Sequence, residues 1–279
     1  MLALATSIAL YAVASLIRGE RWHQVVGRAG LAVPRAHTYR LTVVGYMGNN
    51  VLPARSGDVL RAFLLAPLAR TRKRHVLGTV VAERLLDAAA LVLVFGVVGY
   101  GLLREDIPGG RPVVLVALAL AVLAAAGVLF ALAARRRNAL RRLRDAVRPL
   151  STPTRALAST HGVMLFVLSV ALWTLEASVY LTVGRAAGIE LGLLEALYVV
   201  ALTNLFALVP AAPGYVGTFD AGVLFALDSL GATGSQALSY LVLARFVLFV
   251  PITLVGFVFL VTRYGGWARL RAARQEAAA

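Results

Sequence analysis

The residues that could do chemistry are charged side chains set inside otherwise apolar stretches. The first group surrounds a break in the apolar region 38–68 and comprises Asn50, Pro53, Arg55, Gly57, Asp58 and Arg61. Arg55, Asp58 and Arg61 are spaced by three residues, so a helix would place them near one face. A helix that starts near Ser56 would also point its N-terminus, which favours anions, at the break. The group predicts either a phosphate-binding site or a cluster in which the arginines pair with Asp58 and reach the headgroups.

A second group opens the next apolar segment with Glu83, Arg84 and Asp87. Glu83 and Asp87 share a helical face, and Arg84 lies about 100° round from Glu83. We expect a neutralised cluster that packs this segment against the arginines of the first group. Contact of the cluster with a ligand is the alternative.

Glu176 and Arg245 stand alone within two later apolar segments. A charge in hydrocarbon costs at least about 2.5–3.5 kcal/mol, so each needs a partner, a wet cavity or an interface. Nothing close to Glu176 in the sequence neutralises it. The hypothesis is therefore an interhelical pair between Glu176 and Arg245.

A second broken apolar region spans 193–230, and its polar positions resemble those of the first. Its pattern is Asn204, Pro210, Gly217 and Asp220, with Gly214 as a further point of close backbone approach. Asp220 could face a substrate or simply cap a helix. Interrupted apolar segments in both halves indicate an inverted repeat with a site near the membrane midplane. The alternative is that Pro and Gly only break helices while Asn caps them.

The elements that must position these residues are membrane helices. The chain of 279 residues is 60% hydrophobic with a mean hydropathy of +0.81, too apolar for a soluble core. Unbroken segments long enough to span occupy 79–103, 113–134, 163–187 and 238–262, and a shorter first span precedes Arg18. The prediction is one all-α, polytopic membrane domain with two oppositely oriented broken hairpins, at about 38–68 and 193–230. The first hairpin is too short to span comfortably, which favours a re-entrant form, and the second is open between re-entrant and spanning.

The charge distribution predicts the orientation, and the absence of certain residues and motifs excludes several classes of function. The net charge is +15, and the arginines gather in short loops between apolar runs, above all in 135–161. The positive-inside rule then places that loop and the C-terminus on the cytoplasmic side of a cell membrane. The rule also accounts for the positive charge, so nucleic-acid binding is not needed to explain it. There are no cysteines, the four histidines lack metal-ligand spacing, and no nucleotide, serine-hydrolase or zinc-protease motif occurs. We expect no metal, no cofactor and no catalytic group.

The segment GYMGNNVLPARSGDVLRAFLL resembles the signature of the lysylphosphatidylglycerol synthase transmembrane-region family. The resemblance is carried by Asn50, Pro53, Arg55, Gly57, Asp58 and Arg61, and further by Glu83, Arg84, Asp87, Pro213, Gly214, Gly217, Asp220 and Arg245. Asp58 and Asp220 stand where the family usually has Glu, which keeps the charge but shortens its reach. The resemblance implies lipid handling, and the absence of a soluble aminoacyl-transfer domain in this sequence disfavours lipid synthesis.

Three functions remain open. The first is a flippase-like translocase that moves an anionic, aminoacylated or polyprenyl-linked lipid across the cytoplasmic membrane. The second is a membrane-embedded transferase that uses lipid-linked substrates, and the third is a non-catalytic partner of a separate lipid synthase. The expected partners are membrane lipids, either anionic phospholipids or lipid-linked sugars, with a homodimer and a separate synthase or glycosyltransferase as further possibilities.

Overall fold

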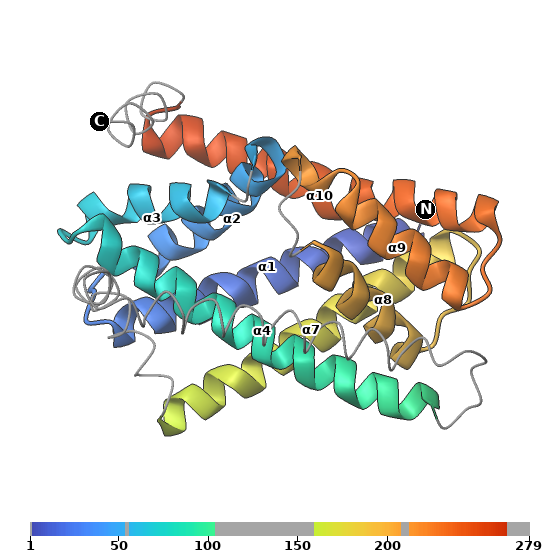
Figure 1. Cartoon of the computed structure of the whole chain (residues 1–279). Helices are drawn as coiled ribbons and strands as arrows, with labels where there is room; N and C mark the ends of the chain where they lie inside the picture. The colour runs from blue at the N-terminus through green and yellow to red at the C-terminus, as the bar shows by residue number, and fades with distance from the viewer. Residues whose placement is uncertain (1, 54–55, 104–158, 208–211, 267–279) are drawn as a thin grey trace, which may run out of the picture.

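The structure is a computed structural model, and it describes residues 2–53, 56–103, 159–207 and 212–266 (Figure 1). Every regular element within these residues is a helix, so the prediction of an all-α fold is confirmed. Among the described residues, three helices are long and apolar enough to cross a membrane: Leu2–Arg28, Thr160–Ala186 and Gly234–Tyr264. The predicted span 113–134 and most of the predicted loop 135–161 lie outside the described residues.

The described helices form two series of similar design. The first contains α1 (Leu2–Arg28), α2 (Arg35–Val51), α3 (Ser56–Leu68) and α4 (Lys73–Leu103). The second contains α7 (Thr160–Ala186), α8 (Leu193–Phe206), the 3-10 turn η2 (Pro213–Tyr215), α9 (Thr218–Ser229) and α10 (Gly234–Tyr264). Each series is thus a long helix, a hairpin of two short helices and a second long helix.

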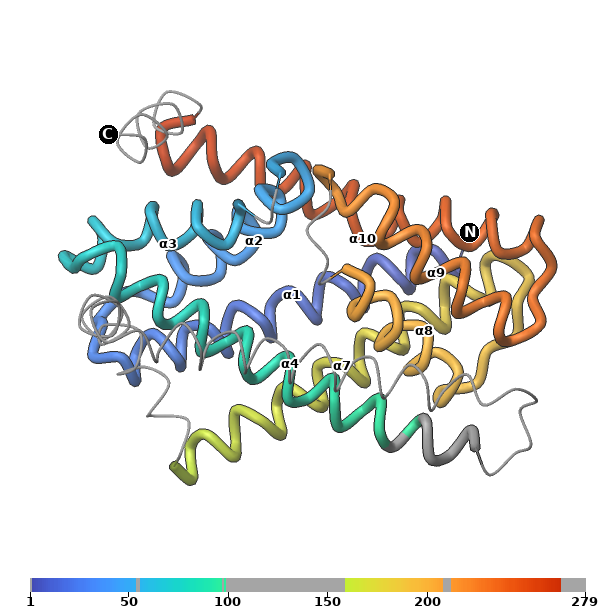
Figure 2. The backbone as a smooth tube through the Cα atoms, in the orientation of Figure 1, coloured from blue at the N-terminus to red at the C-terminus, as the bar shows by residue number. Residues whose placement is uncertain are grey.

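The two series run in opposite directions. In Figure 2, α1 runs against α7, α4 runs against α10, and the α2–α3 and α8–α9 hairpins enter from opposite ends of the bundle. The contacts between the two series follow the same relation. Helix α1 packs on α7, α2 of the first series packs on α10 of the second, and α8 of the second packs on α4 of the first. The predicted inverted repeat is therefore present in the arrangement of the helices.

Helix α1 is longer than the sequence indicated. The apolar run before Arg18 was predicted as a short first span, and no role was assigned to Arg18 or Arg21. The helix continues to Arg28, and the side chains of Arg18 and Arg21 are buried. They stay inside the bundle because acids from three other helical positions neutralise them, as described below.

Close backbone approach holds the first hairpin together. A Cβ built on Gly48 would lie 2.7 Å from the Cα of Gly57, and one built on Gly57 would strike the backbone of α2 at Gly45 and Asn49. Small residues at such crossings let membrane helices pack through their backbones. Gly57 therefore positions Asp58 by fixing α3 against α2. In the second hairpin, a Cβ on Gly222 would lie 2.8 Å from the Cα of Thr203.

The hairpins are also fixed to the long helices and to each other. Gly256 of α10 lets α2 approach, since a Cβ there would lie 2.5 Å from the Cβ of Met47. Nearby, the Asn50 side-chain amide donates to Thr253 Oγ1 at 2.9 Å. The tip of the second hairpin touches the end of α2, because a Cβ on Gly214 would lie 3.3 Å from the carbonyl oxygen of Asn50. The two hairpin tips thus meet within the bundle, as Figure 1 shows.

Candidate functional site

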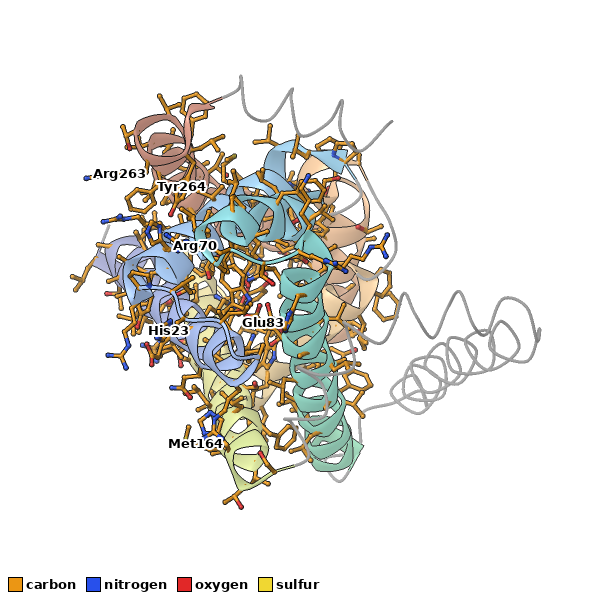
Figure 3. The ribbon with its side chains drawn as sticks, turned by 90° about the vertical axis from the view of Figure 1, so that its left-hand side faces the viewer. His23, Arg70, Glu83, Met164, Arg263 and Tyr264 are labelled. Carbon is orange, nitrogen blue, oxygen red and sulfur yellow. The ribbon has the colours of Figure 1, made fainter. Side chains whose placement is uncertain are left out.

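Arg21 of α1 is the centre of a buried charge network. Its Nη1 lies 2.6 Å from Asp87 Oδ1 and donates to Ser169 Oγ at 2.8 Å, and its Nη2 lies 3.1 Å from Glu83 Oε1. Figure 3 shows Glu83 on the side of α4 that faces the interior of the bundle. Because Arg21 and Glu83 are both almost fully buried, the ion pairs replace the hydration that each charge has lost.

Arg61 of α3 joins the hairpin to this network. Its Nη2 lies 2.7 Å from Glu83 Oε2 and 3.1 Å from Asp58 Oδ1. Its guanidinium also stacks on Trp22, with the central carbon 4.6 Å from the ring centroid. The sequence prediction that the α4 acids pack against a hairpin arginine is therefore confirmed for Arg61. Arg55 lies outside the described residues.

Arg84 forms the accessible edge of the network. Its Nε and Nη2 donate to the two carboxylate oxygens of Asp58 at 3.0 and 2.8 Å, which is a bidentate pair, and its Nη1 donates to Asp87 at 3.2 Å. The side chain of Arg84 is 30% exposed, whereas that of Arg61 is 2% exposed. Of these arginines, Arg84 is the one that an incoming group can reach.

Arg18 pairs with Glu176 where α1 crosses α7. The hypothesis of a Glu176–Arg245 pair is wrong, because Arg18 of α1 neutralises Glu176 and Arg245 pairs with Asp220. The Arg18 guanidinium carbon also lies 5.3 Å from the ring centroid of Tyr46 and 5.8 Å from that of Tyr11. Together, this separate pair and the network comprise four arginines and four acids: Arg18, Arg21, Arg61, Arg84, Asp58, Glu83, Asp87 and Glu176.

Arg245 of α10 pairs with Asp220 at the tip of the second hairpin. Its Nε donates to Asp220 Oδ1 at 2.6 Å, and its Nη1 donates to the carbonyl oxygen of Gly214 at 3.3 Å. The guanidinium lies over Phe219 and Phe249. Asp220 Oδ2 meanwhile accepts from the Gly217 backbone N–H at 2.9 Å, so Asp220 both caps α9 and holds Arg245.

The Arg245–Asp220 pair repeats the Arg84–Asp58 pair. Asp58 is the third residue of α3, which starts at Ser56, and Asp220 is the third residue of α9, which starts at Thr218. Arg84 and Arg245 are each the twelfth residue of α4 and α10. Their exposure is similar, with side chains 30% and 27% exposed. Each half of the fold therefore places one partly exposed arginine–aspartate pair at its hairpin tip.

The other predicted residues have local roles. Gly214 and Gly217 have φ values of +66° and +89°, which explains the need for glycine in this turn. Tyr215 between them also has a positive φ of +55°, so backbone strain is held at the hairpin tip. Asn204 donates to the Val200 carbonyl of its own helix, and Pro53 is exposed beside the start of α3. Within the described part of the chain, no group of three or more acids or histidines is suited to hold a metal ion.

Comparison with known proteins gives a family and two relatives. Residues 1–256 match the model of the family described as lysylphosphatidylglycerol synthase TM region. A UPF0104 membrane protein of Methanothermobacter thermautotrophicus is 23% identical over 263 residues, which cover 85% of this chain and 78% of the relative. A protein of Haloferax volcanii named glycosyltransferase AglD is 24% identical over 258 residues, covering 77% of this chain but 41% of that protein. No solved structure matches this chain.

Proposed function

We propose that this chain, which belongs to the lysylphosphatidylglycerol synthase TM-region family, moves an anionic lipid across the membrane. The observation that carries the proposal is the pair of repeat-related ion pairs, Arg84–Asp58 and Arg245–Asp220, at the tips of two opposed hairpins that touch. Inverted repeats with broken helices that meet between them are typical of transporters. Each arginine would bind the phosphate of a headgroup that enters from its own end of the bundle.

The local chemistry suits an exchange of a carboxylate for a phosphate. A guanidinium binds a phosphate through the same two-pronged geometry that Arg84 now uses for Asp58. If a phosphate replaces Asp58 as the partner of Arg84, Asp58 is still neutralised by Arg61, which lies 3.1 Å from it. In the second half, the Gly217 N–H continues to hold Asp220 when Arg245 turns to a ligand. Neither exchange leaves an acid without a partner.

Helix lengths support hairpins that end inside the bilayer. At about 1.5 Å per residue, the 17 residues of α2 and the 13 of α3 reach about 26 and 20 Å, short of a core about 30 Å thick. The 14 residues of α8 and the 12 of α9 reach only about 21 and 18 Å. We propose that both hairpins are re-entrant, so that their tips present the two ion pairs within the membrane.

The distribution of positive charge supports an orientation in the cytoplasmic membrane. Exposed arginines gather where α1 ends, α2 begins and α4 begins, at Arg28, Arg35, Arg70, Arg72 and Arg74, and α10 carries Arg263 in its last turn. The positive-inside rule assigns this end of the bundle to the cytoplasm. The first hairpin would then open towards the inner leaflet and the second towards the outer leaflet.

The test is lipid movement by the purified protein in liposomes that contain fluorescent phosphatidylglycerol. Asp220→Asn should slow movement by about tenfold or more, because a charge-assisted bond that positions Arg245 is lost. Asp228→Asn is the matched control, since Asp228 is exposed on the same helix, and it should move lipid at the wild-type rate. Equal rates in both variants would remove the second ion pair from the proposal.

The similarity to the protein named glycosyltransferase AglD favours a second candidate, a transferase that acts on lipid-linked substrates. The aligned part covers less than half of that relative, so its whole activity does not transfer to this chain. A transferase forms a new covalent product when donor and lipid acceptor are supplied, whereas a translocase does not. Mass spectrometry of the lipids before and after incubation separates the two.

A further inference from the structure

Arg18 and its partner Glu176 occupy related positions in the two halves of the fold. Arg18 lies ten residues before Arg28, where α1 ends, and Glu176 lies ten residues before Ala186, where α7 ends. The two positions are therefore equivalent in the two repeats, and their side chains meet where these helices cross. A contact between equivalent positions of two repeats lies on the axis that relates them. The Arg18–Glu176 pair is thus midway between the two halves.

One nitrogen of the Arg18 guanidinium lacks a hydrogen-bond partner among the described residues. Its Nη2 donates to Glu176, whereas its Nη1 is buried and has no hydrogen-bond partner among the described residues. The Arg18 side chain is only 4% exposed, so this N–H group has also lost water. A buried donor without a partner is costly and uncommon, and it calls for a ligand, a water or a functional reason.

Aromatic side chains connect Arg18 to both hairpins. Tyr46 of α2 and Tyr11 of α1 lie over its guanidinium. Tyr215 in η2, at the tip of the second hairpin, packs edge-on against Phe249, whose ring centroid lies 5.2 Å from the Arg245 guanidinium. Tyr11, Tyr46, Tyr215 and Phe249 belong to one packed cluster, which therefore reaches from Arg18 to Arg245.

We propose that Arg18 is a third phosphate seat, placed between Arg84 and Arg245 and covered by Tyr46 in this conformation. The inference rests on the proposed function and adds the route by which a headgroup phosphate crosses between the two halves. The phosphate would bind Nη1 of Arg18 while Nη2 keeps Glu176 neutralised, because the two ends of a guanidinium can serve two partners at once. Since Tyr46 belongs to the first hairpin, movement of that hairpin would uncover the seat.

The decisive variant is Arg18→Lys, measured for phosphatidylglycerol movement in liposomes and for thermal unfolding. Lysine keeps a positive charge for Glu176 but lacks the second, unpartnered nitrogen. We expect an unfolding temperature close to that of the wild type and a rate lowered by about tenfold or more. A wild-type rate would overturn the proposal. Should this variant fail to fold, Arg18→Gln with Glu176→Gln replaces the pair by a neutral one and must show the same loss of rate.

The control and a binding measurement separate this inference from the proposed function. Arg35→Gln with Glu20→Gln removes an ion pair 3.4 Å apart, in which the Arg35 side chain is 71% and the Glu20 side chain 26% exposed, and should leave the rate unchanged. If the wild type moves no lipid, the proposed function fails for phosphatidylglycerol, and the seat is then tested by binding alone. Soluble dihexanoyl phosphatidylglycerol should raise the unfolding temperature of the wild type more than that of Arg18→Lys. An equal rise in both proteins would overturn the seat.

Discussion

Removing Arg21 should destabilise the protein more than removing any exposed arginine. The side chain of Arg21 is fully buried and contacts Asp87, Glu83 and Ser169. Arg21→Met fills the same space with an apolar chain but leaves Glu83 with Arg61 and Asp87 with Arg84 as their remaining partners. Four acids then face three arginines in the interior.

The expected loss follows from the cost of one uncompensated charge. Breaking a buried ion pair by removing one partner costs about 3–5 kcal/mol, because the remaining charge stays desolvated. Arg21→Met combined with Asp87→Leu removes one charge of each sign and should recover about half of that loss or more, since an apolar replacement of a whole pair is close to neutral. The matched control is Arg35→Met, whose side chain is 71% exposed, and it should cost at most about 1 kcal/mol.

Unfolding of the detergent-solubilised protein by a denaturing detergent, followed by tryptophan fluorescence, measures these differences. Trp22 is a suitable reporter, because it is fully buried and its Nε1 donates to Thr79 beside the network. If Arg21→Met unfolded within about 1 kcal/mol of the wild type, the charge balance would not be what holds α1 against α4. A double variant less stable than Arg21→Met would refute the reasoning in the same way.

Two further predictions concern the hairpins. Gly57→Ala should lower stability by about 1–3 kcal/mol in the same unfolding assay, because its Cβ would meet the backbone of α2, whereas Gly96→Ala, with open space around it, should cost nothing. The chain has no native cysteines, so Val51→Cys and Val216→Cys at the exposed parts of the two hairpin tips can each be labelled with a membrane-impermeant maleimide. Re-entrant hairpins should resist labelling from the side opposite their own entry, whereas a tip labelled from that far side would indicate a hairpin that spans the membrane.

The sequence was sufficient for the parts of the fold that depend on local pattern. The two broken regions, their opposed directions and the roles of Asp58 and Arg61 in one cluster follow from apolar runs, loop charges and spacings of three residues. The structure adds the reason for Gly57, which contacts a helix backbone, and for Gly214 and Gly217, which adopt positive φ.

The pairings between distant helices could not be predicted from the sequence. Arg18 and Arg21 stand directly after an apolar run, where arginines ordinarily mark the end of a span, and their partners lie 158 and 62–66 residues away. Glu176 did carry a signal, since a buried acid without a neighbour implies an arginine elsewhere. Arg245 was the wrong choice because Asp220, 25 residues before it, already occupied it. Only the packing of α1 against α7 decides between the two arginines.

The Arg18–Glu176 pair also bears on how such a fold can arise. Two separate, identical half-length chains arranged with the same symmetry would place one residue type at both of these positions. Arginine would then face arginine, or glutamate would face glutamate, and like charges would repel at the heart of the dimer. A salt bridge at this place requires that the two halves diverge independently, which becomes possible once a duplicated gene encodes both in a single polypeptide.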